Sequence, residues 1–302
     1  MKVNCVIVTY NRLSLLKECL EAVKQQTFPI NQTIIVDNCS TDETGDFLKQ
    51  FENEENIQVI RTEKNIGGAG GFSLGLKSAV MEGCDFTWLM DDDTIPTPTA
   101  LEELIKVAAE HPNTGFVCSR VNWTNGEEHI MNRPNLFNNE ILKNKQRIPA
   151  VHPCRTCSFV SVLINSTAVY RLGLPIKEFF IWCDDIEYTE RISKSGYPCY
   201  YTDHSIALHK TAVNYFPSID KAPASMATRF YYQARNTSYL KRKSTSNRIF
   251  FYLAILNKYR VYKHKLNKRT DGDKKAFLDA VKRGCKDGLT FNPQIEYIEQ
   301  KK

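Results

Sequence analysis

The sequence predicts an α/β fold, in which a mixed, mostly parallel β-sheet is flanked by helices and followed by a mostly helical C-terminal extension. Short apolar, β-branched segments alternate with helical segments over residues 3–119, which is typical of sheets covered by helices. Beyond residue 220, basic and aromatic residues replace this alternation. We therefore expect one domain over residues 1–215 and a basic, aromatic helical extension over residues 216–302.

The spacing of apolar residues predicts the individual elements. Buried strands need continuous apolar runs, whereas a helix with one buried face repeats its apolar residues every three or four positions. Strands are expected at residues 3–9, 33–37, 57–61, 86–90, 114–119 and 201–208, and helices at residues 13–25, 44–51, 70–82 and 99–110. Residues 123–150 are rich in asparagine, which predicts a long loop or hairpin insertion.

Composition excludes several classes of protein. Of the 302 residues, 42% are hydrophobic and 25% are charged, which argues against disorder, collagen and coiled coil. The sequence has no apolar run of about 18 residues, so no transmembrane helix is predicted. The N-terminus lacks the features of a signal peptide. We therefore expect a cytoplasmic protein whose 10 scattered cysteines are reduced.

Charge is divided unevenly along the chain. Residues 1–220 carry 20 basic and 28 acidic residues, a net charge of −8, and residues 221–302 carry 20 basic and 6 acidic residues, a net charge of +14. Residues 221–270 hold 13 basic residues and no acidic one. Such a segment can pack on protein, bind nucleic acid or lie on an anionic membrane. Packing explains residues 226–240. For residues 241–269 we expect peripheral contact with the inner face of the cell membrane, with a second subunit of a homo-oligomer as the alternative; no nucleic-acid motif is present.

Polar residues follow four of the predicted strands. The carboxyl ends of parallel strands meet at one edge of a sheet, where ligands bind. Each polar ending alone could be a turn or a helix cap, but four on one edge predict a ligand site. They comprise Thr9, Tyr10, Asn11 and Arg12; Asp37 and Asn38; Asn65, Gly68, Gly70 and Gly71; and Asp91, Asp92 and Asp93.

The acidic triplet is the most specific of these endings. Adjacent carboxylates repel one another, and a bound cation removes that cost. Mg²⁺ and Mn²⁺ prefer carboxylate oxygens and share their other positions with phosphate. A solvated acidic loop is the alternative, but it does not explain why Asp91 directly follows the apolar residues Trp88, Leu89 and Met90. We favour a metal site.

As a set, the strand-end motifs resemble the family 2 glycosyltransferases of the GT-A fold, which have a Rossmann-like sheet that binds a nucleotide-sugar. The matching motifs are residues 6–12, 35–42, 65–71 and 91–93. The resemblance covers residues 1–215, which makes them the expected catalytic domain, and continues more weakly through residues 231–236 and 284–289. With the acidic triplet, these last two segments are most similar to the galactofuranosyltransferase and rhamnosyltransferase branch.

The resemblance implies a metal-dependent, inverting hexosyltransferase. It would move galactofuranose or rhamnose from a UDP- or dTDP-sugar to a hydroxyl of a surface polysaccharide or lipid-linked glycan. Asp37 would bind the base of the nucleotide, and Asp91 would lie near the ribose and diphosphate. Mn²⁺ or Mg²⁺ would be bound by Asp91, Asp93 and His209. Asp92 and the other strand-end residues would line the nucleotide-sugar site.

A second acidic cluster follows Trp182. An inverting transfer needs a base that takes the proton from the acceptor hydroxyl. The resemblance implies Asp185 as this base and Trp182 and Asp184 as ligands of the acceptor. The alternative is that these acidic residues only begin a helix, where the helix dipole favours negative charge. This alternative explains a single acidic residue better than two adjacent ones beside a tryptophan.

Two other functions fit the sequence less well. A sugar-phosphate nucleotidylyltransferase would carry a glycine-rich loop after the first strand, where this chain has Thr9-Tyr10-Asn11-Arg12. A non-catalytic relative that binds a nucleotide or glycan could lose its acidic residues. Because the expected metal ligands and the expected base are all present, we expect an enzyme.

Overall fold

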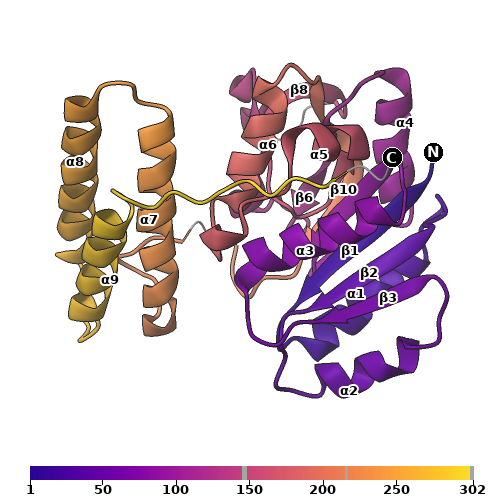
Figure 1. Ribbon diagram of the computed structural model, residues 1–302, viewed down its shortest axis with the longest axis horizontal. Coiled ribbons are helices and arrows are strands. Elements are labelled where there is room, and N and C mark those ends of the chain that lie inside the picture. Colours follow the sequence, from indigo (N-terminus) through magenta and orange to yellow (C-terminus); the bar gives the residue numbers. More distant parts are fainter. Residues whose placement is uncertain (145–147, 215–216, 300–302) are drawn as a thin grey trace. The chain divides into compact units, whose positions relative to one another are not determined.

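The computed structural model describes residues 1–144, 148–214 and 217–299. The chain forms two compact units (Figure 1). Unit 1 comprises Met1–Lys177, Asp185–Tyr215 and Ile295–Lys302, and unit 2 comprises Glu178–Asp184 and Phe216–Gln294. The division into domains at residue 215 stays a prediction. The main boundary between the two units also falls after residue 215. However, unit 2 includes residues 178–184 from before this boundary, and unit 1 includes residues 295–302 from after it.

Unit 1 is built on a ten-stranded mixed sheet with the order β3-β2-β1-β4-β9-β6-β10-β8-β7, and β5 pairs with β10. Its first four main strands are parallel: β1 (Val3–Thr9), β2 (Gln32–Asp37), β3 (Ile57–Arg61) and β4 (Phe86–Asp91). The remaining strands are β5 (Thr94–Pro96), β6 (Phe116–Asn122), β7 (Asn135–Leu136), β8 (Val151–Thr156), β9 (Val162–Asn165) and β10 (Cys199–His209). The predicted α/β class is therefore confirmed, and β9 makes the sheet mixed because it runs antiparallel to β4 and β6.

Helices cover both faces of this sheet because its central strands are apolar on both sides. Every residue of β1 is buried, and alternate residues point to opposite faces. Val6 and Val8 belong to one core cluster with Leu76 of α3, whereas Ile7 belongs to another with Leu16 of α1. The helices of unit 1 are α1 (Leu13–Lys24), α2 (Thr44–Leu48), α3 (Gly67–Met81), α4 (Ala100–Glu110), α5 (Ser166–Leu172) and most of α6 (Asp184–Lys194).

The asparagine-rich insertion is ordered around short elements. It contains a 3₁₀ turn, η2 (Ile130–Asn132), then β7 and a second 3₁₀ turn, η3 (Asn139–Lys143). β7 pairs antiparallel with β8, as in the expected hairpin. Residues 145–147 of this insertion lie outside the described part of the chain.

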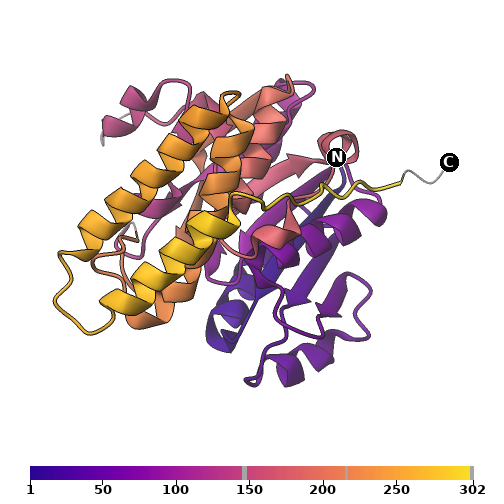
Figure 2. The same cartoon turned by 60° about the vertical axis from the view of Figure 1, so that its left-hand side comes forward.

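Unit 2 consists mainly of three helices, α7 (Ala227–Lys243), α8 (Arg248–Leu266) and α9 (Lys274–Asp287), which lie side by side (Figure 2). This confirms the predicted helical C-terminal part. Phe230 of α7, Ile255 of α8 and Phe277 of α9 share its core. α9 approaches α7 so closely at Gly284 that a Cβ there would lie 2.3 Å from the carbonyl oxygen of Tyr231. Among the described residues, no helix combines the length and apolar character needed to cross a bilayer.

Candidate active site

The strand register brings the predicted polar residues to one edge of the sheet. Thr9 at the end of β1 pairs with Asp37 at the end of β2, and Val8 pairs with Asp91 at the end of β4. The parallel direction of these strands therefore gathers residues that are far apart in the sequence, as expected for a ligand site at the carboxyl edge of an open sheet.

The three predicted metal ligands meet at this edge. One ligand atom each of Asp91, Asp93 and His209 lies within 4.8 Å of those of the other two. The approach of His209 results from strand pairing, because β5 directly follows the acidic triplet and its Thr94 pairs with His209 of β10. The backbone N–H of Lys210 also donates to the carbonyl oxygen of Asp93 over 2.9 Å.

The orientation of His209 fits a metal ligand. Its Nδ1 lies 2.7 Å from Oδ1 of Asn132. Because an amide oxygen only accepts, Nδ1 carries a proton, so Nε2 is the ring nitrogen that can exchange its proton for a metal. Nε2 lies 3.0 Å from Oδ1 of Asp93, a buried atom for which the described residues provide no well-aligned hydrogen bond. A nitrogen lone pair and a carboxylate oxygen that face one another are suited to share a divalent cation.

Asn132 and His129 also belong to this site, although neither was predicted to have a role there. The Nδ2 of Asn132 donates to Oγ of Ser158 over 2.9 Å, which holds the amide in place. The ring of His129 lies 4.7 Å from that of His209, centroid to centroid, and burial lowers its pKa to about 4. His129 is therefore neutral near pH 7. The only sequence signal for these two residues was the polar character of residues 123–150. No rule of sequence spacing connects Asn132 or His129 with His209.

The acidic triplet divides into two roles. Asp92 is bound by the protein, because it accepts from Oγ1 of Thr9 over 2.7 Å and from the N–H of Tyr10, and pairs with Arg12 over 3.3 Å. Arg12 also pairs with Asp93. The carboxylate of Asp91 is not among these contacts and instead completes the cluster with Asp93 and His209.

Burial makes the negative charge of this cluster costly. Burial, followed by repulsion from Asp93, raises the pKa of Asp91 to about 7. Burial also raises the pKa of Asp92 to about 6, against the attraction of Arg12. For Asp93, burial is outweighed by His209 and Arg12, and its pKa is lowered. The cluster thus favours a cation, which would relieve the repulsion between the carboxylates.

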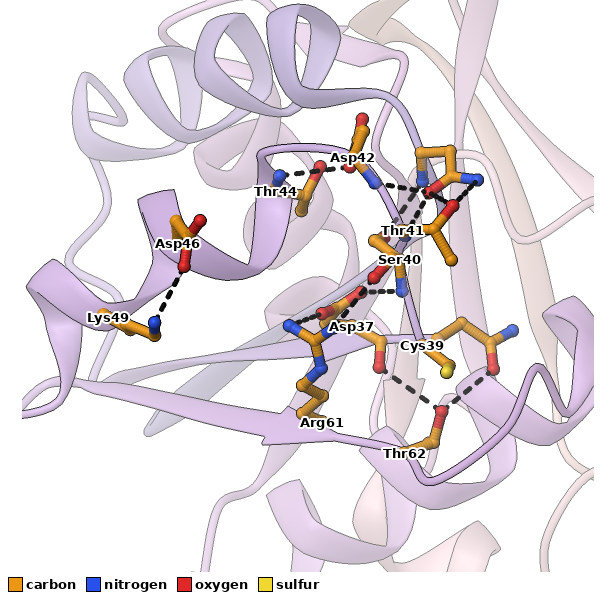
Figure 3. A network of polar contacts seen from close by, with 12 residues as sticks. Asp37, Cys39, Ser40, Thr41, Asp42, Thr44, Asp46, Lys49, Arg61 and Thr62 are labelled. Carbon is orange, nitrogen blue, oxygen red and sulfur yellow. Dashed lines mark hydrogen bonds and ion pairs between the residues drawn. The ribbon is translucent and has the colours of Figure 1, made fainter.

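Asp37 is buried at the end of β2 with one carboxylate oxygen engaged. Oδ1 accepts from the backbone N–H of Ser40 over 2.9 Å. Oδ2 lies 3.4 Å from Nη1 of Arg61, and no aligned donor reaches it within the described residues. Figure 3 shows Arg61 and Ser40 beside Asp37. An acceptor of this kind suits a ring N–H of a nucleobase.

The predicted asparagines shape the loops around Asp37. Asn11, in the left-handed region with φ 54°, accepts from the N–H of Thr41 over 2.7 Å. Asn38 accepts from the N–H of Ile66, and Asn65 from the N–H of Gly67, each over 2.8 Å. Tyr10 is exposed. The side-chain oxygens of the three asparagines are thus used by the protein, and contact of these residues with a nucleotide stays a prediction.

The glycine cluster lies in a helix rather than in a loop. α3 begins at Gly67, three residues before its expected start. At Gly71 a Cβ would lie 2.6 Å from Cγ1 of Val8, so this glycine allows α3 to pack against β1. At Gly70 a Cβ would meet Ile66, whereas at Gly68 it would meet nothing within 4 Å. Gly68 is therefore the glycine with open space beside it, as a ligand would require.

Asp184 and Asp185 begin α6, and Trp182 lies two residues before it; the chain passes from unit 2 into unit 1 between Asp184 and Asp185. Trp182 contacts Phe230 within unit 2, with ring centroids 5.4 Å apart. In unit 1, Asp185 accepts from the N–H of Ile186 over 2.7 Å. Burial raises the pKa of Asp185 to about 6, so its carboxylate is ionised near pH 7 and able to accept a proton.

Residues 5–166 match the family model for glycosyl transferase family 2. This chain belongs to that family. The match includes all four strand-end motifs, and it confirms the resemblance on which the expected site was based.

Similar proteins agree with this assignment. The chain is 27% identical to the galactofuranosyltransferase GlfT1 of Mycolicibacterium smegmatis over 204 residues, which is 64% of this chain and 66% of that relative. The crystal structure of Staphylococcus aureus TarS 1-349 in complex with UDP-GlcNAc has a TM-score of 0.57 at 15% identity, covering 93% of this chain and 79% of that one. A structure of GalNAc-T7 with UDP, GalNAc and Mn²⁺ has a TM-score of 0.57 at 13% identity and covers 79% of this chain and 51% of that one.

Proposed function

We propose that this protein is a metal-dependent, inverting glycosyltransferase. The observation that carries the proposal is the cluster of partly buried Asp91 with buried Asp93 and His209, on the same sheet edge as Asp37. A divalent cation, Mn²⁺ or Mg²⁺, held by this cluster would neutralise the charge that develops on the departing diphosphate. Membership in family 2 supports the same reaction class.

The chain's own residues perform the other tasks of the proposed reaction. Asp37 binds the base of the nucleotide through Oδ2, the carboxylate oxygen that no aligned donor reaches within the described residues. Arg12 holds Asp92 and Asp93 in place and adds positive charge beside the diphosphate. Asp185 takes the proton of the acceptor hydroxyl as that oxygen attacks the anomeric carbon. Trp182 and Asp184 bind the acceptor sugar.

The similarity to a galactofuranosyltransferase supports a UDP-linked galactofuranose as the donor, with a dTDP-linked rhamnose as the second candidate. The acceptor we propose is a hydroxyl of a growing surface polysaccharide or of a lipid-linked glycan.

The experiment is a screen of UDP- and dTDP-sugars for release of the nucleoside diphosphate that depends on a glycan acceptor. Release with at least one donor, reduced about 10²- to 10⁴-fold in Asp185→Asn, is the expected result. Binding of UDP or dTDP without transfer from any donor would instead favour a non-catalytic relative. Release of pyrophosphate from a nucleoside triphosphate and a sugar phosphate would favour a nucleotidylyltransferase.

We also propose that the protein binds the cytoplasmic face of an anionic membrane through α8. The inner face of this helix packs in unit 2 through Phe251, Ile255 and Leu266. Its outer face exposes large apolar side chains over the first turns, where Ile249 is 70%, Phe250 65% and Leu253 55% exposed. An exposed apolar face of this kind marks an interaction surface.

Charge identifies the partner of this face. α8 carries five basic residues and no acidic one, and Lys241 and Lys243 precede it at the end of α7. Apolar side chains beside basic ones suit the boundary between anionic headgroups and acyl chains. The same charges oppose pairing of this face with its copy in a second molecule.

A further inference from the structure

The loop that leads into α6 has an unusual backbone. Within unit 2, Phe180, Trp182 and Cys183 have φ values of 64°, 64° and 73°. Residues with a Cβ rarely adopt this left-handed region, and they keep it only where the surrounding structure imposes it. Three such residues within four positions therefore require strong support from their neighbours.

α7 provides this support through Asn236. Its Nδ2 donates to the carbonyl oxygens of Phe179 over 2.9 Å, Ile181 over 3.2 Å and Trp182 over 2.9 Å. One amide group thus binds three carbonyls of the same short loop. Because the side chain of Asn236 is fully buried, water cannot replace these bonds.

Two neighbours on α7 bind the same loop. The guanidinium group of Arg235 donates to the carbonyl oxygens of Glu178 and Phe179, and its Cζ lies over Phe291, 4.0 Å from the ring centroid. The ring of Tyr232 stacks on Phe180 with centroids 4.6 Å apart. These contacts give a role to Tyr232, Arg235 and Asn236, three residues of the 231–236 motif that the proposed chemistry does not use.

We propose that Asn236 is a positioning residue for the acceptor site. It holds the loop of residues 178–184, including its three left-handed residues, in the conformation that presents Trp182 and Asp184 and leads directly into Asp185. The functional part of this inference rests on the proposed roles of those three residues. An asparagine that only satisfied polar groups of the helical core would not need to bind three carbonyls of one strained loop.

Asn236→Asp tests the proposal most directly, because it keeps the shape of the side chain but replaces the donating group with an acceptor that repels the three carbonyls. Asn257→Asp is the matched control, since it makes the same chemical change at an exposed position of α8. Tyr232→Leu is a milder second variant that removes only the ring stacked on Phe180. Tyr231→Phe removes a hydrogen bond between α7 and α9 and measures a purely structural loss.

Hydrogen exchange and kinetics provide independent readouts. In Asn236→Asp we expect amide exchange in residues 179–184 to accelerate at least tenfold, while both controls resemble the wild type. The KM for the acceptor should rise about 10- to 100-fold, as for a misplaced binding group, with the Kd of UDP unchanged. The effects of Tyr232→Leu should have the same direction and be smaller.

Unchanged exchange and an unchanged acceptor KM in Asn236→Asp and Tyr232→Leu would overturn the proposal. So would equal changes in Tyr231→Phe, because the effect would then follow the stability of the helical unit. If the wild type transferred no sugar, the proposed function would fail; the exchange experiment would still decide whether Asn236 holds the loop.

Discussion

At the residue scale, the neutral side chain of Asn132 orients the ring of His209, one of the proposed metal ligands. It accepts from Nδ1 of His209 and thereby leaves Nε2 to face Asp93. Asn132→Leu keeps the size of the side chain but removes the acceptor, so His209 is free to rotate or change tautomer. Loss of such a contact typically weakens metal affinity about 10- to 100-fold. We expect this increase in the Kd of Mn²⁺, measured by electron paramagnetic resonance of the free ion.

The control is Asn125→Leu, which changes an exposed asparagine of the same insertion and should retain the wild-type Kd. Equal Mn²⁺ affinities in the wild type and both variants would refute the role of Asn132.

Asp185 determines the expected pH dependence. Burial raises its pKa to about 6, and a base acts only when it is deprotonated. The kcat/KM for transfer should therefore be constant well above pH 6 and should fall about tenfold per pH unit well below it.

Asp185→Asn should reduce transfer by about 10²- to 10⁴-fold and leave the Kd of UDP nearly unchanged. If Asp184→Asn abolished transfer and Asp185→Asn did not, the two acids would have the opposite roles.

At the scale of elements, the glycines of α3 differ in what surrounds them. Gly70 and Gly71 are closely packed, whereas Gly68 faces open space. Gly71→Ala would place a methyl group against Val8 of β1, and we expect it to lower the free energy of unfolding by about 1–3 kcal/mol, as for an overpacked core. Gly68→Ala should be neutral or stabilising by up to about 1 kcal/mol, because alanine favours helix over glycine. If Gly68 borders the nucleotide, the same change should raise the Kd of UDP. Urea unfolding and UDP titration of both variants separate the two effects, and a larger stability loss in Gly68→Ala would contradict this interpretation.

Apolar spacing predicted the parallel strands β1 to β4 well, because burial of these strands depends on their own side chains, but it did not predict β5, β8 or β9. β1, β3 and the start of α1 lie where that spacing placed them. The start of α3 was missed, since glycine disfavours helix and close packing on β1 outweighs that preference. The contacts of Asn132 with His209 and of Asn236 with the 178–184 loop join distant parts of the chain, and no local pattern encodes such contacts. The acidic triplet by itself indicated a metal site, whereas His209 could be expected as a ligand only because of the resemblance.

At the scale of the whole molecule, net charge differs in sign between residues 1–220 and 221–302, which supports the proposed membrane contact. Replacing Lys241, Lys243 and Arg248 by Gln removes three charges, each worth about 1 kcal/mol near an anionic surface. We expect affinity for vesicles containing phosphatidylserine to fall about 100-fold, and to weaken as salt rises in the wild type. Arg242 is left unchanged because it binds the carbonyls of Leu289 and Phe291.

The apolar part of the same surface needs its own variant. Phe250→Gln with Leu253→Gln should also weaken vesicle binding, whereas Ile148→Gln, at an exposed apolar residue of unit 1, should not. Transfer to a short soluble acceptor should be unaffected in all of these proteins. Absence of vesicle binding by the wild type at low salt would exclude the membrane and favour a second subunit as the partner of α8.

The most direct test of the central claim is the metal dependence of transfer by the wild type. With its donor and acceptor present, excess chelator should abolish release of the nucleoside diphosphate, and Mn²⁺ or Mg²⁺ should restore it. Asp93→Ala should lose about 10²-fold or more of this activity even with added metal, because it removes one electrostatic stabiliser. Full turnover in excess chelator, or an Asp93→Ala variant as active as the wild type, would contradict the account.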